Sequence, residues 1–386
     1  MTSMSTPEVA PEVVGEENNF KNSFMSGEFL IPETIASTQI LGPEEYLNEI
    51  QSRFGYVIPE ANLQAMREIS VVCIGLGVMG RTMEELARYG VSNFVVVDVP
   101  GEIGGVEVSN LNRQVGSFRD TAEYRTAEAH ERIGGRPKAE VVARAVLDIN
   151  PHAKVHAISK MLTSNEVGFL MTQADVAFWG HDDPVGVMDL LEGARIAGIP
   201  VFSGLDLASN AYVRIILNDT SSRGMPVLNG AITMEEAEKL KVAPAGKLTF
   251  LAKSAGIPIE QMIPLELIQN LVAILQGKTR ILSQVPSAVG AFAEQTAFRL
   301  AMVAPEVKAK NLDKKALDRI GLKQDVFFRN WERNFGLIQR LKREAIRLAY
   351  LSNRQLQQVL GYERGLGPIR YTNMVVRGLM SALIGR

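Results

Sequence analysis

The sequence predicts an α/β fold, in which a mostly parallel β-sheet carries helices on both faces and is followed by a mainly helical C-terminal region. Three observations favour this class. Short β-branched runs such as Ser70–Ile74 and Phe94–Asp98 alternate with segments of helical periodicity. A glycine-rich turn joins the first of these runs to a helix. Beyond Met234 the spacing of apolar residues becomes mainly helical.

The individual elements follow from the same patterns. Strands are expected over Ser70–Ile74, Phe94–Asp98, Val155–Ile158, Val176–Trp179 and Pro200–Ser203. Before and after the first strand, helices are expected between Glu45 and Glu68 and over Thr82–Tyr89. In the C-terminal region they are expected over Pro264–Gln276, Val289–Val303 and Val326–Leu351.

Composition restricts the possible functions. With 386 residues, 46% of them apolar, the chain can bury a full core. Its formal net charge of -2 indicates neither a nucleic acid nor an anionic membrane as partner. The sequence has neither a long uncharged apolar run nor a signal-peptide pattern, so a cytoplasmic protein is expected.

The single cysteine, Cys73, lies inside an apolar run, where a buried packing residue is more common than a nucleophile. A thiolate zinc site needs several cysteines at short spacing, and the four histidines show no ligand pattern. No zinc is therefore expected.

Gly75, Gly77 and Gly80 form a GxGxxG turn between a strand and a helix, which is typical of a Rossmann-like nucleotide site. Glycines at these positions permit a tight turn, a close approach to phosphate and close helix packing, and a helix N-terminus favours negative charge. Asp98 ends the next strand, near the spacing of an acid that bonds a ribose hydroxyl. A nucleotide is expected, and on these residues alone both NAD and ATP remain open.

A polar set further along the chain favours ATP. Arg113 and Lys138 can supply the fixed cations that the phosphoryl oxygens need while pyrophosphate is displaced. Asp182 follows an apolar strand, at a position suited to hold a magnesium ion. Each of these residues alone is explained equally well as a surface polar group. An NAD-dependent oxidoreductase, however, has no need of the set.

The order of these motifs resembles the adenylation domain of ThiF, MoeB and the ubiquitin-activating enzymes. The likeness covers about residues 45–217 and includes Ser-Asn-Leu-Asn-Arg-Gln, Gly-x-Pro-Lys-Ala-Glu, Ile-Asn-Pro and Gly-Ile-Pro besides the glycine turn. It implies ATP-dependent adenylation of a carboxylate. It also implies Asp98 on the ribose, Asn110, Arg113 and Gln114 near the phosphates, Lys138 on the triphosphate and Asp182 on magnesium.

The same resemblance implies an assembly and a division of the chain. Arg53 resembles the arginine that family members supply to the partner subunit's nucleotide, which implies a homodimer with shared sites. The expected division is an N-terminal arm (1–44), an ATP-binding adenylation domain (45–232), and a mainly helical region for substrate or dimer contacts (233–386).

The sequence departs from the family pattern at several places. Val78 replaces the middle glycine of the turn, and the segment between Asp98 and Asn110 carries extra residues and lacks the usual second Asp. A further insertion separates Arg113 from Lys138. The thiolate zinc site and the transfer cysteine are missing, so thioester formation is not expected.

Without a transfer cysteine, the acyl-adenylate itself would be delivered to a nucleophile. This resembles the peptide-modifying branch of microcin- and pantocin-type biosynthesis, and it implies a ribosomally made peptide substrate in antibiotic production. The alternatives are a small protein or a small-molecule carboxylate as substrate, an NAD-dependent oxidoreductase, and a non-catalytic scaffold of the same fold.

Overall fold

The computed structural model describes residues 41–130, 132–181, 183–207, 210–217, 232–242, 286–322, 325–329, 337–352 and 371–376, with residues 246, 249, 250, 268, 357 and 380. Most of the expected N-terminal arm therefore lies outside the described residues. So does the helix expected over Pro264–Gln276, apart from residue 268.

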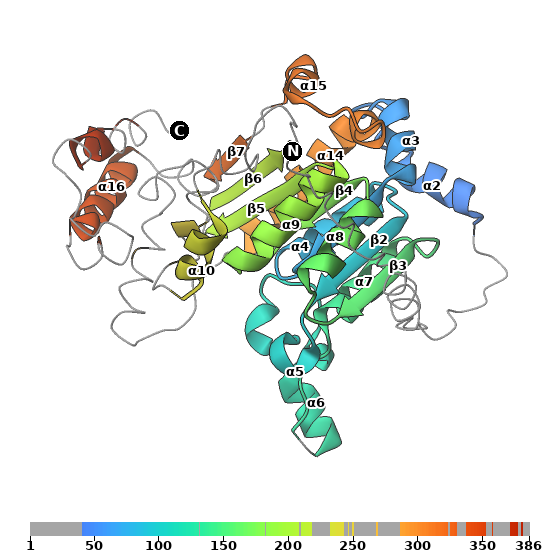
Figure 1. Ribbon diagram of the computed structural model, residues 1–386, viewed down its shortest axis with the longest axis horizontal. Coiled ribbons are helices and arrows are strands. Elements are labelled where there is room, and N and C mark those ends of the chain that lie inside the picture. Colours follow the sequence, from blue (N-terminus) through green and yellow to red (C-terminus); the bar gives the residue numbers. More distant parts are fainter. Residues whose placement is uncertain are drawn as a thin grey trace, which may run out of the picture.

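A seven-stranded sheet with the order β3-β2-β1-β4-β5-β6-β7 forms the centre of the molecule (Figure 1). The strands are β1 (Ser70–Ile74), β2 (Asn93–Asp98), β3 (Lys154–Ser159), β4 (Val176–Trp179), β5 (Val201–Leu207), β6 (Asn210–Ile216) and β7 (Asp325–Arg329). The first five run parallel, and β6 and β7 are antiparallel to their neighbours. The expected α/β fold with a mostly parallel sheet is confirmed.

Helices cover both faces of this sheet. In chain order they are α2 (Pro43–Gln51), α3 (Glu60–Glu68), α4 (Met79–Arg88), α5 (Gly101–Gly104), the 3-10 turns η1 (Val108–Asn110) and η2 (Phe118–Asp120), α6 (Ala122–Ala129), α7 (Lys138–Ile149), α8 (Ser164–Thr172), α9 (Pro184–Ala197), α10 (Met234–Val242), α14 (Pro286–Lys308), α15 (Lys314–Arg319) and α16 (Leu337–Leu351). Helices α5 and α6 project away from the sheet (Figure 1).

The alternation of side chains along β1 divides the core into two layers. Val71 and Cys73 belong to a cluster with residues of α3, α4, α7 and α14, whereas Val72 belongs to a cluster with residues of α8, α9 and α10. Cys73 has no exposed surface, which confirms its expected burial. The core therefore fills both sides of the sheet, as a parallel sheet requires.

The C-terminal part of the chain contributes to this core. Helix α14 packs on α3, α4, β5 and β6, and β7 pairs with β6. The helix expected over Val326–Leu351 is wrong at its beginning, because residues 325–329 form β7 and helix α16 begins only at Leu337. The run Val326-Phe327-Phe328 has a high β-propensity, and the free edge of β6 gives it a pairing partner that no local pattern reveals.

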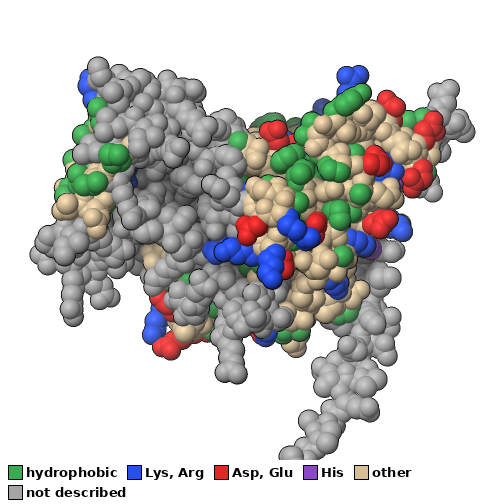
Figure 2. Space-filling model, turned by 90° about the horizontal axis from the view of Figure 1, so that it is seen from above, with side chains coloured by type: hydrophobic (Ala, Val, Ile, Leu, Met, Phe, Trp, Pro, Cys, Tyr) green, Lys and Arg blue, Asp and Glu red, His purple; other side chains and the backbone are tan. Residues whose placement is uncertain are grey.

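Charged side chains of both signs are interspersed on the described face seen in Figure 2. This agrees with the small net charge of the sequence. In the part of the chain that the structure describes, none of the helices has the length and apolar character needed to span a bilayer.

Two glycines hold the turns after β1 and β4 in backbone contact. Gly75 has a φ of +89°, and a Cβ there would lie 2.4 Å from the backbone nitrogen of His181. A Cβ on Gly180 would lie 2.0 Å from the carbonyl oxygen of Gly75. Neither position can accept a side chain without moving the main chain.

We expect Gly180→Ala to lower the free energy of unfolding by about 1–3 kcal/mol or more, because overpacking at this contact must displace a turn. Gly168→Ala in α8 is the matched control: outside its own helix backbone and chain neighbours, no atom of the described residues lies within 4 Å of its Cβ position. Since glycine weakens a helix interior, the control should gain about 0.5–1 kcal/mol. Urea unfolding of the two variants measures both values, and equal stabilities would contradict the proposed contact.

Candidate functional site

The candidate site lies where the strand order reverses. Strand β1 pairs with β2 on one side and with β4 on the other, so the connections after β1 and β4 leave toward opposite sides of the sheet. In open parallel sheets this point forms a crevice at the carboxyl ends of the strands, where ligands bind. The turn after β1 and the turn after β4 meet there through Gly75 and Gly180.

The three glycines of the motif have different roles. Gly75 permits the left-handed turn and the contact with residues 180 and 181. Gly80 lets α4 pack closely, since a Cβ there would lie 2.9 Å from Val142 and 3.2 Å from Val115. At Gly77, by contrast, the only described atom within 4 Å of a Cβ is Nε2 of Gln114, at 3.6 Å. Gly77 is thus the one of the three whose open side suits a close approach by a phosphate.

Val78, which stands where the family has a glycine, is the N-cap residue of α4. Its φ of −74° and ψ of −32° are ordinary helical values that any L-residue adopts, so this turn does not require glycine at that position. Among the described residues, no side chain caps α4. The N–H groups of Gly80 and Arg81 donate to the carbonyls of Leu76 and Val78 at 3.2 Å, which leaves the preceding N–H groups of this helix N-terminus for an anion.

Asp98 connects the end of β2 to the glycine turn. Its Oδ2 accepts a hydrogen bond of 2.7 Å from the backbone N–H of Leu76, and its Oδ1 accepts one of 2.8 Å from that of Val99. Each carboxylate oxygen retains a second acceptor site. The structure therefore shows Asp98 shaping the turn, and its contact with a ribose stays a prediction.

The segment from Glu107 to Gln114 lies beside this turn. Asn110 is buried and caps η1, with Oδ1 accepting from the backbone N–H of Glu107 at 3.2 Å. Nη1 of Arg113 donates to the carbonyl of Ser109 at 2.8 Å and to Oδ1 of Asn112 at 2.9 Å. Buried Gln114 places Nε2 near Gly77, and its Oε1 accepts no hydrogen bond from the described residues.

Lys138 is the first residue of α7, after Pro137 at the N-cap. Its side chain is half-buried and takes part in no hydrogen bond or ion pair with the described residues. Helix α7 packs against α4, so Lys138 and the glycine turn belong to neighbouring helix N-termini. Two such N-termini favour negative charge in the space before them.

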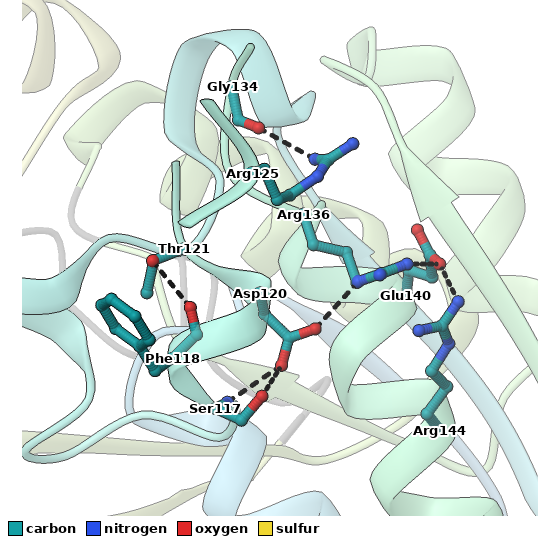
Figure 3. A network of polar contacts seen from close by, with 9 residues as sticks. All are labelled: Ser117, Phe118, Asp120, Thr121, Arg125, Gly134, Arg136, Glu140 and Arg144. Carbon is teal, nitrogen blue, oxygen red and sulfur yellow. Dashed lines mark hydrogen bonds and ion pairs between the residues drawn. The ribbon is translucent and has the colours of Figure 1, made fainter. Parts of the chain in front are cut away.

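A polar network holds the segment before α7 (Figure 3). Nε of Arg136 donates to Oδ1 of Asp120 at 2.8 Å, and its Nη1 donates to Oε1 of Glu140 at 2.7 Å. Oδ2 of Asp120 accepts from the backbone N–H and the hydroxyl of Ser117 at 2.9 and 2.7 Å. Arg144 also binds Glu140. We call Ser117, Asp120, Arg136, Glu140 and Arg144 the α7 network.

Ionisation of the Asp120–Arg136 pair is favoured inside this network. Partial burial disfavours the Asp120 carboxylate, but hydrogen bonds from Ser117 and the hydrogen bond and charge of Arg136 outweigh it and lower the pKa of Asp120. Partial burial likewise opposes the charge of Arg136, yet Glu140 and Asp120 raise the pKa of its guanidinium.

The extra glycines between Asp98 and Asn110 have a structural reason. Cβ atoms on Gly101 and Gly105 would each lie 2.4 Å from the carbonyl oxygen of Gly135, and one on Gly135 would lie 2.1 Å from that of Val106. The glycines at 101, 105 and 135 therefore allow residues 101–106 to lie directly against residues 134–135, which precede Lys138 in the chain.

Two of the expected site residues are not placed with the others. Arg53 is exposed, next to Phe54, whose ring stacks on Tyr89 with centroids 4.8 Å apart. Tyr89 follows the last residue of α4, about 15 Å along the helix from the glycine turn. Asp182 lies outside the described residues.

Sequence patterns did not reveal several residues that shape the site. Gly180, Asp120 and the side-chain role of Arg136 emerge only from contacts between segments that are distant in the chain. The sequence offers one signal for the neighbourhood of Arg136, which is the concentration of glycines at positions 101–105 and 134–135.

The chain belongs to the ThiF family, which it matches over residues 51–381. The molybdopterin-synthase adenylyltransferase of Escherichia coli is 26% identical over 153 residues, 39% of this chain and 55% of that protein. The SAMP-activating enzyme E1 of Haloferax volcanii is 28% identical over 178 residues, 46% of this chain and 50% of that protein. This chain thus spans about half the length of these curated relatives.

Solved structures give more distant likenesses. A crystal structure of PaaA aligns with a TM-score of 0.48 at 14% identity and covers 83% of this chain and 80% of that one. Escherichia coli MccB crystallised with ATP aligns with a TM-score of 0.42 at 16% identity and covers 80% and 74%. Likenesses at this level do not indicate what the present chain acts on.

Asp120→Asn should lower the free energy of unfolding at neutral pH by about 1–3 kcal/mol, because Arg136 and Ser117 lose a charged partner. Since folding lowers the pKa of Asp120, its contribution is present above the unfolded value of about 3.9 and is lost as the pH falls through the folded value. The wild type should therefore lose more stability than the variant between about pH 5 and about pH 3.

Urea unfolding at several pH values measures this difference. Asp148→Asn, the same change at an exposed position of α7, is the control and should behave like the wild type. If the wild type and Asp120→Asn show parallel acid curves, the carboxylate is not held by the network.

Proposed function

We propose that this chain uses ATP to adenylate a carboxylate and releases pyrophosphate. One observation carries the proposal: Gly77, on the turn at the strand-order reversal, has an open side next to buried Gln114, with the N-terminus of α4 beside it. Membership of the ThiF family supports it, as does the presence of two named activating enzymes among the relatives. A glycine turn with these neighbours suits the phosphates of a nucleotide.

In the proposed reaction, an oxygen of the substrate carboxylate forms a bond to the α-phosphorus of ATP. The bond from that phosphorus to the bridging oxygen breaks, and the electron pair leaves with pyrophosphate. Fixed cations stabilise the negative charge that gathers on the departing oxygens. Arg113, whose guanidinium is held by Ser109 and Asn112, and Lys138 are the residues that we assign to this task.

We assign a magnesium site to Asp182, as the family pattern implies. The assignment is supported by the preceding residue His181, whose backbone nitrogen would lie 2.4 Å from a Cβ on Gly75. A carboxylate ligand is typical for magnesium, and the ion would contribute positive charge next to the phosphates. In this proposal, Arg113, Gln114 and Lys138 orient the nucleotide, and Asp182 holds the magnesium ion.

A thioester stage does not fit the chain. Its only cysteine, Cys73, lies in the middle of β1 and is fully buried. Burial and the nearby charge of Asp98 raise the pKa of this thiol well above its ordinary value, which disfavours the nucleophilic thiolate. The acyl-adenylate would therefore pass directly to its acceptor.

We further propose a ribosomally made peptide as the source of the carboxylate. Two observations support this. The motifs resemble those of the peptide-modifying branch, which lacks the transfer cysteine, and the one cysteine of the sequence, Cys73, is buried. Residues 45–232 would bind ATP, and residues 233–386 would contribute substrate or dimer contacts.

The proposed active form is a homodimer in which Arg53 serves the partner subunit. Phe54 and Gln51 anchor its loop near Tyr89, at the end of α4 away from the glycine turn. The length of α4 between Tyr89 and the glycine turn, about 15 Å, is longer than an arginine side chain, which supports a role for Arg53 in another subunit.

Calorimetry should show that ATP with magnesium binds and that NAD does not. Lys138→Ala and Arg113→Ala should each weaken ATP binding by about tenfold or more, since each removes a charged contact. Arg195→Ala, which removes a partly exposed cation in the last turn of α9, on the other face of the sheet, is the control and should bind ATP like the wild type. Binding of NAD in place of ATP would overturn the proposal.

A mixed dimer tests the role of Arg53. Arg53→Ala and Lys138→Ala should each weaken ATP binding by about tenfold or more at both sites of their own dimers. A mixed dimer would instead hold one site with both defects and one with neither. Differently tagged chains, co-purified as the mixed dimer, should bind about one ATP tightly per dimer. A monomer in sedimentation, or a mixed dimer without a tight site, would refute the shared site.

A further inference from the structure

We propose that Asp120 and Arg136 are positioning residues, which hold the 109–114 segment and the start of α7 in one fixed arrangement around the phosphates. The inference rests on the proposed function, because it concerns the same site. Neither residue is among those expected to touch the nucleotide. Their role would be to fix where Arg113, Gln114 and Lys138 stand.

The side-chain contacts join the η2 turn, which follows the 109–114 segment, to the first turn of α7. Arg136 uses two nitrogens of its planar fork, Nε for Asp120 at 2.8 Å and Nη1 for Glu140 at 2.7 Å, so its orientation is determined (Figure 3). Asp120 holds Ser117 with its second oxygen. Ser117 follows Gln114 by three residues, and Glu140 lies in the first turn of α7.

Backbone hydrogen bonds also join the segment around Asp120 to the segment before α7. The N–H of Arg136 donates to the carbonyl of Asp120 at 2.8 Å, and the carbonyl of Arg136 accepts from the N–H of Val106 at 3.1 Å. Val106 in turn accepts from the N–H of Ala122 at 3.1 Å. Only Pro137, with its restricted φ, separates this pairing from Lys138. Little freedom therefore remains between the Asp120–Arg136 pair and the backbone of Lys138.

A purely structural role makes a different prediction. If the pair only stabilised the projecting α5–α6 part, its loss would lower the free energy of unfolding and weaken the binding of ATP and AMP equally. If it positions cations for the triphosphate, its loss should weaken ATP much more than AMP, which lacks the β- and γ-phosphates. The ratio of the two dissociation constants separates these roles and needs no acyl substrate.

The experiment measures ATP and AMP binding to the full-length chain by calorimetry, well below the unfolding temperature. Asp120→Asn should weaken ATP binding by about 3- to 30-fold, which lies inside the range for coupled neighbours, and leave AMP binding within about twofold. In a Lys138→Ala background, Asp120→Asn should have a much smaller effect on ATP, because the cation that it positions is gone.

Two further variants complete the test. Arg136→Lys keeps the charge but not the two-nitrogen fork, so it should show the same selective loss and gives a readout if Asp120→Asn does not fold. Glu192→Gln removes the matched ion pair with Arg195 on α9, 2.6 Å apart, and should leave both affinities unchanged.

The outcomes distinguish this inference from the proposed function. If the wild type does not bind ATP, the proposed function fails and the inference fails with it. If the wild type binds ATP but the variants keep its ATP-to-AMP ratio, or lose both nucleotides equally, only the positioning role is overturned. Additive effects of Asp120→Asn and Lys138→Ala would also overturn it.

Discussion

The contact between the turns after β1 and β4 is the constraint on which the candidate site depends. Gly180 lies so close to the carbonyl of Gly75 that no side chain fits between them, and Gly75 itself requires a left-handed backbone. Asp98 fixes the same turn from the side of β2 through the N–H of Leu76. Main-chain contacts and the short carboxylate side chain of Asp98 therefore set the position of Gly77 at the sheet crevice.

The parts of the chain that depart from the family pattern support this geometry instead of disturbing it. Val78 adopts helical torsions that need no glycine. The extra glycines at 101 and 105 let their segment lie against Gly135, and the α7 network joins the inserted segment to the first turn of α7. The first turn of α7 is thereby connected to the insertion that separates Arg113 from Lys138 in sequence.

Membership of the ThiF family and the buried state of Cys73 together restrict the chemistry that the chain can perform. Because Cys73 is buried within β1, forming a thioester on it would require this strand to open. Direct transfer from the proposed acyl-adenylate would avoid this cost, since AMP is already a good leaving group. Arg53, at the far end of α4, is the residue whose proposed role depends on a second subunit.

Local patterns in the sequence determined the class of fold, the strands β1 to β4 nearly to the residue, the burial of Cys73 and the glycine turn with its family. These follow from side-chain periodicity and from the few residues that tolerate a tight turn. Tertiary structure alone decided that residues 325–329 form a strand, because the edge of β6 supplies the hydrogen bonds. It also decided that Gly180 touches Gly75 and that Asp120 pairs with Arg136. Such contacts join residues that are far apart in the chain, and they form only when the whole sheet brings those residues within reach.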